Sequence, residues 1–288
     1  MERFFTIAGF TWRLILPKGA SWSCSGNLAA FSTEGGPWDH TLECRFCSTL
    51  PPAEGELVYN SPEKQLFRSG EIRSQYRGVM AQGLDGAYMS LRRQGSHTQV
   101  FLKEQAFQGT VSQKAVLCAL ELEHQLAGRD GFILHASWVR WRDRAILFTA
   151  PSGTGKSTQA ELWCRLRGAE LMNGDRAAVF AAADGVPQVR GIPFAGSSGV
   201  CRNEAMPLAA IVYLSQAPET TIAPLSGFRA FRSIWEGCSV AALEREDAQR
   251  CLQSAMTVLE QVPVYHLACT PDESAVLALE RLLRTEGV

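Results

Sequence analysis

Apolar and polar residues follow two different patterns along the chain. Up to about residue 110, short stretches of alternating polarity are separated by turn-forming clusters such as Gly35-Gly36-Pro37, a pattern that predicts short β-strands. Ala87–Arg92 and Thr98–Lys103 are two such stretches, and the turn around Gly95 between them predicts a hairpin. We therefore expect residues 1–110 to form a β-rich N-terminal domain.

From residue 111 onward the pattern changes to alternating helices and strands. Apolar residues three and four positions apart predict helices over Val111–Leu126, Gly155–Arg167, Val240–Leu259 and Pro271–Leu283. Short apolar runs predict strands over Phe132–His135, Ala145–Thr149, Leu208–Leu214 and Pro263–Leu267. Residues 111–288 are thus expected to form an α/β domain with a central mixed sheet flanked by helices.

The segment Ala150–Ser157 (APSGTGKS) carries the most specific motif of the chain. Its spacing is that of a P-loop, or Walker A motif, with alanine in place of the first glycine, and it lies between a predicted strand and a predicted helix. Backbone N–H groups of such a loop close around phosphate oxygens, and the positive helix N-terminus stabilises the anion. The alternative is a glycine-rich turn ahead of an ordinary helix.

This motif makes a nucleoside triphosphate, ATP or another, the expected ligand, together with Mg²⁺. Lys156 would contact the β and γ phosphates, and the Ser157 hydroxyl would bind Mg²⁺. The residues expected to contact the nucleotide are Ser152, Gly153, Thr154, Gly155, Lys156, Ser157 and Thr158.

Asp175, in the stretch Leu171–Phe180 (LMNGDRAAVF), is the carboxylate expected to complete this site. The buried run Leu208–Leu214 ends in Ser215-Gln216 and offers no acid, whereas a strand returning beside the P-loop strand would bring Asp175 to the γ-phosphate. There the carboxylate could bind Mg²⁺ or take a proton from an attacking hydroxyl. The alternative interpretation of Asn173-Gly174-Asp175 is a simple turn, which these residues favour.

The charge balance narrows the range of partners. The formal net charge of −1, from 28 basic and 29 acidic residues, gives no long-range attraction to nucleic acid or to an anionic membrane. No run of about 18 apolar residues predicts a membrane span, and the N-terminal stretch lacks a signal-peptide cleavage site. The nine cysteines suit reduced thiols, with Cys44 and Cys47 interpreted as strand thiols rather than metal ligands. We therefore expect a cytoplasmic protein.

Three segments together resemble the HPr serine kinase/phosphatase-like family, which shares its P-loop fold with the phosphoenolpyruvate carboxykinases. They are His135–Trp163, Leu171–Phe180 and Arg190–Val200 (RGIPFAGSSGV). The resemblance covers residues from about 115 to 288. It is strongest to a divergent branch found beside peptide-maturation genes, some of whose members phosphorylate a serine of a precursor peptide.

This resemblance implies roles for individual residues. Lys156 and Ser157 would bind the phosphates and Mg²⁺, Asp175 would activate the acceptor hydroxyl, and His135 would lie near the transferred phosphate. The chain departs from the family pattern at Gly174, where a second acid often precedes the aspartate, which argues against phosphatase activity. It departs again at Gln188, where the family has a glutamate, and an amide is a poorer Mg²⁺ ligand than a carboxylate.

Arg202 follows a second glycine-rich stretch, Gly191–Gly199. This loop could close over the phosphates, with Arg202 stabilising charge in the transition state. The alternative is a surface loop with a solvated arginine.

The sequence therefore favours a kinase that transfers the γ-phosphoryl group to a hydroxyl of a peptide, a protein or a small molecule. The N-terminal domain is a candidate acceptor-binding module, and a homo-oligomer is compatible with the sequence. The alternative is a P-loop ATPase or a nucleotide-binding switch without a phosphorylated acceptor. A carboxykinase-like lyase would need further cationic residues and a second metal site, which the sequence does not offer.

Overall fold

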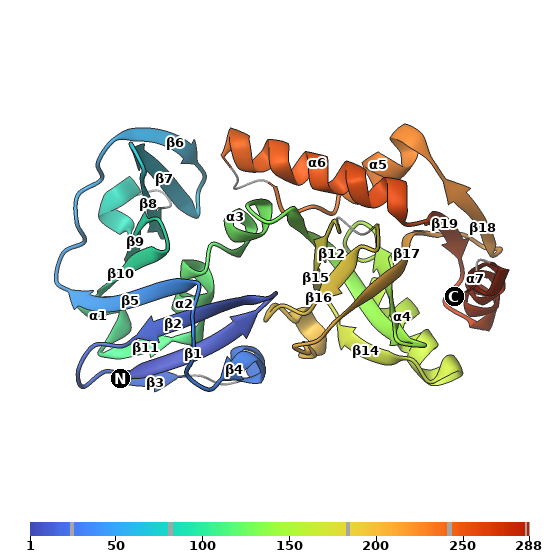
Figure 1. Cartoon of the computed structure of the whole chain (residues 1–288), viewed down its shortest axis with the longest axis horizontal. Coiled ribbons are helices and arrows are strands. Elements are labelled where there is room, and N and C mark those ends of the chain that lie inside the picture. The colour runs from blue at the N-terminus through green and yellow to red at the C-terminus, as the bar shows by residue number, and fades with distance from the viewer. Residues whose placement is uncertain (24–25, 80–82, 183–184, 241–243, 286, 288) are drawn as a thin grey trace. The chain divides into compact units, whose positions relative to one another are not determined.

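The protein is an α/β structure with mixed sheets and helices (Figure 1). The computed structural model describes residues 1–23, 26–79, 83–182, 185–240, 244–285 and 287. The chain divides into two compact units, Met1–Glu121 and Leu122–Val288. We call them the N-terminal unit and the C-terminal unit.

Within the described residues, the main sheet of the N-terminal unit has nine strands. Its elements are β1 (Glu2–Ile7), β2 (Phe10–Ile15), β3 (Ser21–Ser23), β4 (Ser32–Thr33), β5 (His40–Cys47), β6 (Glu56–Asn60), β7 (Lys64–Ser69), β8 (Ile72–Arg77), β9 (Met89–Gln94), β10 (His97–Lys103), α1 (Glu104–Phe107), β11 (Thr110–Ser112) and α2 (Gln113–Ala119). The strand order is β4-β1-β2-β5-β10-β9-β8-β7-β6, and β5 pairs in parallel with both β2 and β10. The hairpin predicted around Gly95 is confirmed, because β9 and β10 pair in antiparallel on either side of it. Cys44 and Cys47 are both free thiols on β5.

The division between the units falls after Glu121 rather than after residue 110. Thr110–Ser112 forms β11, which pairs with β3 and therefore belongs to the N-terminal unit. The single helix expected over Val111–Leu126 is wrong, because the chain breaks at Glu121, whose φ is +45°. There the buried Glu121 carboxylate lies 3.3 Å from the Arg73 guanidinium and 3.1 Å from that of Arg93. A buried carboxylate needs cationic partners of this kind. The spacing of apolar residues, on which the helix prediction is based, gives no information about such ion pairs.

The C-terminal unit contains the P-loop segment. Its elements are α3 (Leu122–Ala127), β12 (Gly131–Trp141), β13 (Arg144–Thr149), α4 (Lys156–Arg167), β14 (Glu170–Asn173), β15 (Arg176–Phe180), β16 (Gln188–Arg190), β17 (Ala205–Gln216), β18 (Thr221–Leu225), α5 (Gly227–Trp235), α6 (Arg245–Gln261), β19 (Val264–Cys269) and α7 (Glu273–Thr285). The strand order is β13-β12-β15-β16-β17-β19-β18, with β14 beside β12 and a further pairing of β13 with β17.

Two long strands, β12 and β17, each change partners along their length. β12 pairs with β15 through residues 131–135 and with β13 through residues 136–141. β17 pairs with β16 through residues 205–207, and its second half lies between β13 and β19. β13, β17 and β19 are parallel to one another. Their carboxyl ends therefore meet at one edge, where ligands of α/β sheets bind.

Helices cover both faces of this sheet, as Figure 1 shows for α4 on one side and α6 on the other. On β13, Phe148 packs into the apolar cluster that contains Trp163 of α4 and Leu279 of α7. Its neighbour Leu147 packs into the opposite cluster, with residues of α5 and α6. Because consecutive strand residues face opposite sides, a strand covered on both faces reads as a continuous apolar run. Burying each large apolar side chain contributes about 1.5–3 kcal/mol.

Most expected elements of the C-terminal unit are confirmed. The strands expected at Ala145–Thr149, Leu208–Leu214 and Pro263–Leu267 are β13, β17 and β19, and the helices expected at Gly155–Arg167 and Pro271–Leu283 are α4 and α7. Phe132–His135 is only the first half of the longer strand β12. α6 begins at Arg245, and residues 241–243 of the helix expected from Val240 lie outside the described residues.

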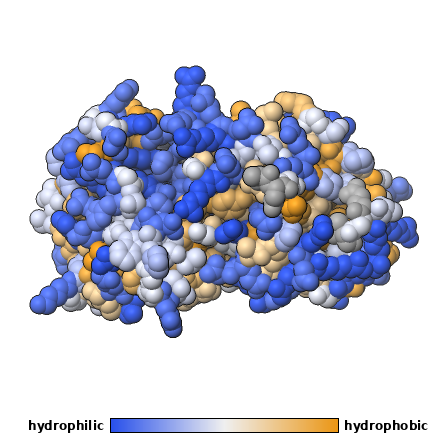
Figure 2. Space-filling model, in the orientation of Figure 1, coloured by the Kyte–Doolittle hydropathy of each residue, from blue (hydrophilic) through white to orange (hydrophobic). Residues whose placement is uncertain are grey.

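The face of the molecule shown in Figure 2 is mostly hydrophilic, with small apolar patches. Large apolar side chains that are exposed, such as Trp38, Leu57 and Phe228, come from separate elements. Among the described residues, none of the helices combines the length and the hydropathy needed to cross a membrane.

Candidate active site

The segment with the P-loop motif, for which we keep the name P-loop, connects the carboxyl end of β13 to the first residue of α4. Its glycines Gly153 and Gly155 have φ angles of +79° and +118°, a backbone conformation that side-chain-bearing residues rarely adopt. A Cβ atom added at either glycine would meet no described atom within 4 Å, so the space beside the loop is open. Ser152, Gly153 and Thr158 are exposed, whereas Ser157 is half-buried at the first turn of the helix. The loop can therefore receive a ligand on its open side.

Lys156 is buried and folds back over the P-loop. Its ammonium donates hydrogen bonds to the carbonyl oxygens of Ala150 (3.0 Å) and Pro151 (3.4 Å). Burial lowers the pKa of Lys156, and the negative charge of Asp175 acts in the opposite direction.

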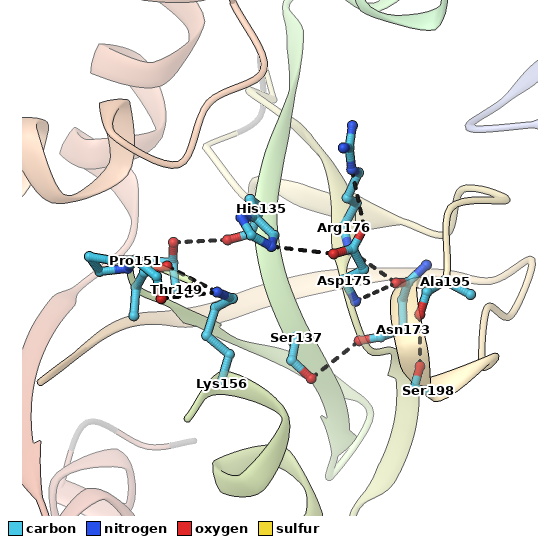
Figure 3. A network of polar contacts seen from close by, with 11 residues as sticks. His135, Ser137, Thr149, Pro151, Lys156, Asn173, Asp175, Arg176, Ala195 and Ser198 are labelled. Carbon is cyan, nitrogen blue, oxygen red and sulfur yellow. Dashed lines mark hydrogen bonds and ion pairs between the residues drawn. The ribbon is translucent and has the colours of Figure 1, made fainter. Parts of the chain in front are cut away.

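His135 lies inside β12, not at the end of a strand as expected, at the point where β12 changes its neighbours on both edges. On one edge, β15 pairs up to His135 and β14 pairs from Trp138 onward. On the other edge, the His135 N–H donates to the Gly237 carbonyl (2.8 Å), and β13 pairs from Ala136 onward. His135 is therefore placed between the P-loop on one side and the turn that joins β14 to β15 on the other (Figure 3).

Asn173 shapes the turn that carries Asp175. Its side-chain oxygen accepts hydrogen bonds from the backbone N–H groups of Asp175 (2.9 Å) and Arg176 (3.0 Å), which is an Asx-type turn. Its side-chain amide donates to the buried Ile192 carbonyl (3.0 Å). The Ala136 N–H donates to the Asp175 carbonyl (2.9 Å), which fixes the turn to β12. The expectation that Asp175 follows a strand beside the P-loop strand is corrected, because β14 and β15 pair with β12.

The Asp175 carboxylate has a histidine and an arginine as partners. Oδ1 lies 3.3 Å from His135 Nε2, and Oδ2 lies 3.2 Å from Arg176 Nε. The hydrogen bond from His135 lowers the pKa of Asp175, the charge of Arg176 lowers it further, and partial burial opposes both. At neutral pH the carboxylate is therefore ionised and held in one orientation beside the P-loop.

The glycine-rich stretch 191–199 packs directly against this turn. A Cβ atom at Gly196 would lie 2.8 Å from Asp175 Cβ, and one at Gly174 would overlap the Ser198 side chain. The Ser198 hydroxyl donates to the Ala195 carbonyl (2.8 Å), as Figure 3 shows. The loop is thus a packed wall of the site.

Residues 110–283 match the family described as "SynChlorMet cassette protein ScmC". The matched stretch is more than half of the chain and includes the P-loop, His135 and the Asp175 turn. The chain belongs to this ScmC family. No curated protein matches the chain significantly.

Among solved structures, one similar to this ScmC family member is that of the HPr(Ser) kinase/phosphatase from Coxiella burnetii. It is 12% identical in sequence, and the match covers 54% of this chain and 95% of that chain, with a TM-score of 0.30. At that TM-score the likeness assigns neither fold nor activity.

In this ScmC protein, Arg202 is held away from Asp175. Its guanidinium pairs with Glu170 (2.7 Å) and donates to the Leu171 carbonyl (3.3 Å). Glu170 begins β14, whereas Asp175 follows the other end of this strand, so the four residues of β14, about 10 Å of extended chain, lie between the two positions. Arg140 joins the same ion-pair network through Glu170 and Glu204. A role for Arg202 at the phosphates therefore stays a prediction, which requires its guanidinium to leave Glu170.

Two residues at the site carry contacts that the sequence did not assign. Asn173 shapes the turn and Arg176 supplies the cation beside Asp175. The sequence Asn173-Gly174-Asp175 is typical of a turn. In the structure it forms a turn that also carries the candidate carboxylate, so the two interpretations are compatible. The sequence could have indicated Arg176, because it is adjacent to Asp175 in the chain.

Two glycine substitutions distinguish how much the close packing of Gly196 and its backbone conformation each contribute to stability. Gly196 and Gly199 have similar φ angles, +57° and +66°, but a Cβ at Gly199 would meet nothing within 4 Å. Gly199→Ala should therefore lower the free energy of unfolding by about 1–2 kcal/mol for backbone strain alone. Gly196→Ala should lower it by about 1–3 kcal/mol more, because the new methyl group displaces Asp175. Urea unfolding of the two variants measures this difference, and equal losses would show that the contact with Asp175 is unimportant.

The lowered pKa of Asp175 predicts how stability changes in acid. A carboxyl group with a lowered folded-state pKa stabilises the fold above its unfolded pKa of about 3.9, and this contribution disappears as the pH falls through the folded-state value. The difference in unfolding free energy between wild type and Asp175→Asn should therefore shrink as the pH falls below about 4. Urea titrations at neutral and acid pH measure it. A difference that is independent of pH would mean that the ionised carboxylate has no net stabilising contact.

Proposed function

We propose that this protein binds a nucleoside triphosphate with Mg²⁺ and transfers its γ-phosphoryl group to a hydroxyl. One observation carries the proposal: the loop with the P-loop motif and its buried lysine lies on one side of His135, and an ionised aspartate lies on the other (Figure 3). A P-loop alone binds phosphate, but transfer also needs a group that orients or deprotonates the attacking nucleophile. The resemblance of this segment to HPr serine kinase-like proteins favours the same chemistry.

In the proposed reaction, the acceptor oxygen forms a bond to the γ-phosphorus while the bond to the β–γ bridging oxygen breaks. Asp175 accepts the proton of the acceptor hydroxyl, and the nucleoside diphosphate leaves with the bridging oxygen. Lys156 and the P-loop N–H groups stabilise the charge on the phosphates. His135 and Arg176 keep the Asp175 carboxylate ionised and oriented.

The residues present fit Mg²⁺ that is bound together with a nucleotide. Mg²⁺ usually keeps several waters and takes only one or two protein ligands plus phosphate oxygens. The Ser157 hydroxyl is such a ligand, and the Asp175 carboxylate is the alternative second ligand if it binds Mg²⁺ instead of accepting the proton. Within the described residues, no group of three or more His, Cys, Asp or Glu side chains could hold a metal ion. When bound, Mg²⁺ would neutralise charge on the β and γ phosphates.

The acceptor that we propose is a hydroxyl of a peptide or protein, such as a serine, with a small-molecule alcohol as a further class. The resemblance to kinases of precursor peptides favours a peptide. The N-terminal unit is the proposed acceptor-binding module.

Labelled ATP separates this proposal from its alternative. Purified protein is incubated with γ-labelled ATP and Mg²⁺, alone and with serine-containing peptides encoded near its gene. Acid-stable label on the peptide, absent with Lys156→Ala, would support the kinase. Release of labelled phosphate at the same rate with and without peptide would favour an ATPase instead. Tight binding of ATP without turnover under any condition would favour a nucleotide-binding switch.

A further inference from the structure

A cavity of about 650 Å³ opens beside the P-loop, on the side away from Asp175. Its walls come from the start of α4 and from the segments that follow β17 and β19, including Gln216–Pro218 and Cys269–Pro271. The Gln216 side-chain amide donates to the Thr154 carbonyl (3.5 Å), which ties the segment after β17 to the P-loop. The cavity is therefore continuous with the phosphate loop.

The lining of the cavity combines apolar and polar groups. Leu214, Ala217, Pro218 and Pro271 contribute apolar surface, and the Thr158 and Thr270 side chains contribute hydroxyls. This mixture, and a volume between about 300 and 1,000 Å³, is typical of sites for small organic ligands. The walls suit the flat apolar face of a nucleobase and the polar edge of a nucleoside.

Gln159 provides the second, independent observation. This residue lies in the first turns of α4, lines the cavity and is only 2% exposed. Its side-chain Nε2 has no hydrogen-bond partner within the described part of the chain. A buried donor without a partner is costly and uncommon in folded proteins. Because Gln159 lines the cavity, a ligand bound there is the candidate for the missing acceptor.

The order of the cavity, the P-loop and the Asp175 turn across the sheet indicates how a bound triphosphate would be oriented. The P-loop follows β13, which has β17 and then β19 on one side and β12 on the other. The cavity lies at the β17 and β19 end, and the Asp175 turn lies beyond β12. Because neighbouring strands are about 4.8 Å apart, a triphosphate that follows the P-loop would have one end at the cavity and the other near Asp175.

We propose that this cavity binds the nucleoside part of the triphosphate, and that the Gln159 side-chain amide donates a hydrogen bond to it. The inference rests on the proposed nucleotide-dependent function and assigns the site that distinguishes a nucleotide from a bare polyphosphate. It places the base between the segments 216–218 and 269–271, with the γ-phosphate toward Asp175.

Cys269 reports directly on occupancy of the cavity. Burial raises the pKa of the Cys269 thiol, and so does the charge of Asp272, so alkylation with iodoacetamide is carried out at alkaline pH and followed by mass spectrometry of each cysteine. The two probes are Mg²⁺–ATP and Mg²⁺–tripolyphosphate, which has the phosphates but no nucleoside. Thermal shift records whether each probe binds. Cys47 of the N-terminal unit is the internal reference for labelling.

The expected result is protection of Cys269 by ATP and not by tripolyphosphate, although both shift the melting temperature. Equal protection by the two probes would overturn the inference, because phosphates alone would then close the cavity. Binding of ATP without protection of Cys269 would also overturn it and would leave the proposed function standing. Failure of both probes to bind would remove the proposed function and the inference together.

Gln159→Leu gives a second test that a purely structural role cannot imitate. The substitution removes an unpaired buried amide, so the free protein should be as stable as wild type or more stable. The affinity for ATP should fall about tenfold, because the hydrogen bond to the nucleoside is lost. The affinity for tripolyphosphate should stay unchanged.

Gln249→Leu, at an exposed position on α6, is the matched control and should alter none of these values. Calorimetric titration measures the affinities for ATP and tripolyphosphate, and thermal unfolding measures the stability of each variant. If Gln159→Leu weakens ATP and tripolyphosphate equally, or leaves both unchanged, Gln159 does not contact the nucleoside.

Discussion

Replacing Lys156 by alanine is expected to lower the affinity for Mg²⁺–ATP by about 10²-fold or more. Truncating one partner of a buried charged contact costs about 2–5 kcal/mol, and Lys156 is the buried cation of the P-loop. Its ammonium donates hydrogen bonds to the carbonyl oxygens of Ala150 and Pro151. Losing these contacts should also lower the free energy of unfolding by about 1–3 kcal/mol. Isothermal titration calorimetry with ATP and Mg²⁺ measures the loss of affinity.

The control is Lys114→Ala, which removes an exposed lysine from α2 of the N-terminal unit. It should bind ATP as wild type does. Thermal unfolding of both variants shows that they are folded. Affinity at the wild-type level in a folded Lys156→Ala protein would remove the P-loop from the mechanism.

Replacing Asp175 by asparagine is expected to lower phosphoryl transfer by about 10²- to 10⁴-fold, the usual contribution of a positioned general base. An asparagine can keep the turn that Asn173 shapes, but it cannot accept a proton. Because a base acts mainly in the transition state, the affinity for ATP should stay close to wild type. Single-turnover transfer from γ-labelled ATP to an acceptor peptide, with ATP titrations alongside, measures the two quantities.

Two other roles for Asp175 predict different results from the same variant. A Mg²⁺ ligand would show weaker ATP binding that is restored by higher Mg²⁺ concentration. A residue that only shapes the turn would show a loss of stability with unchanged transfer. Arg176→Gln is a useful companion, because it removes the charge beside Asp175 and leaves the carboxylate in place. It should reduce transfer less than Asp175→Asn does.

Features that depend on neighbouring residues in the chain were predictable from the sequence. The strand β13 and the helix α4 lie on either side of the P-loop motif as expected, and Gly168 ends this helix with a φ of +64°. The strands β17 and β19 were also predictable, because burial on both faces leaves continuous apolar runs. Each of these signals is contained within about 15 consecutive residues.

Features that depend on contacts between distant segments were not predictable. Asp175 reaches the site through β12 rather than through a strand beside β13, and no local pattern specifies strand partners. Arg202 follows a glycine-rich loop, but its orientation is decided by Glu170, which lies far from it in the sequence. At the break, the Glu121 carboxylate likewise pairs with Arg73 and Arg93, which lie far from it in the sequence. In each case a charged side chain takes a partner that becomes adjacent only after folding.

The Asn173–Asp175 turn has a consequence for transplanting this site. Each of its three residues is committed to a different neighbour: Asn173 to the Ile192 carbonyl, Gly174 to Ser198, and Asp175 to His135 and Gly196. A short peptide graft of the turn onto another P-loop scaffold would carry the carboxylate without the surfaces that aim it. To transfer the site to another protein, the turn would have to be grafted together with the 191–199 loop and the stretch of β12 around His135. In a lineage of related proteins these three segments should therefore change together, since a substitution in one removes a support of the other two.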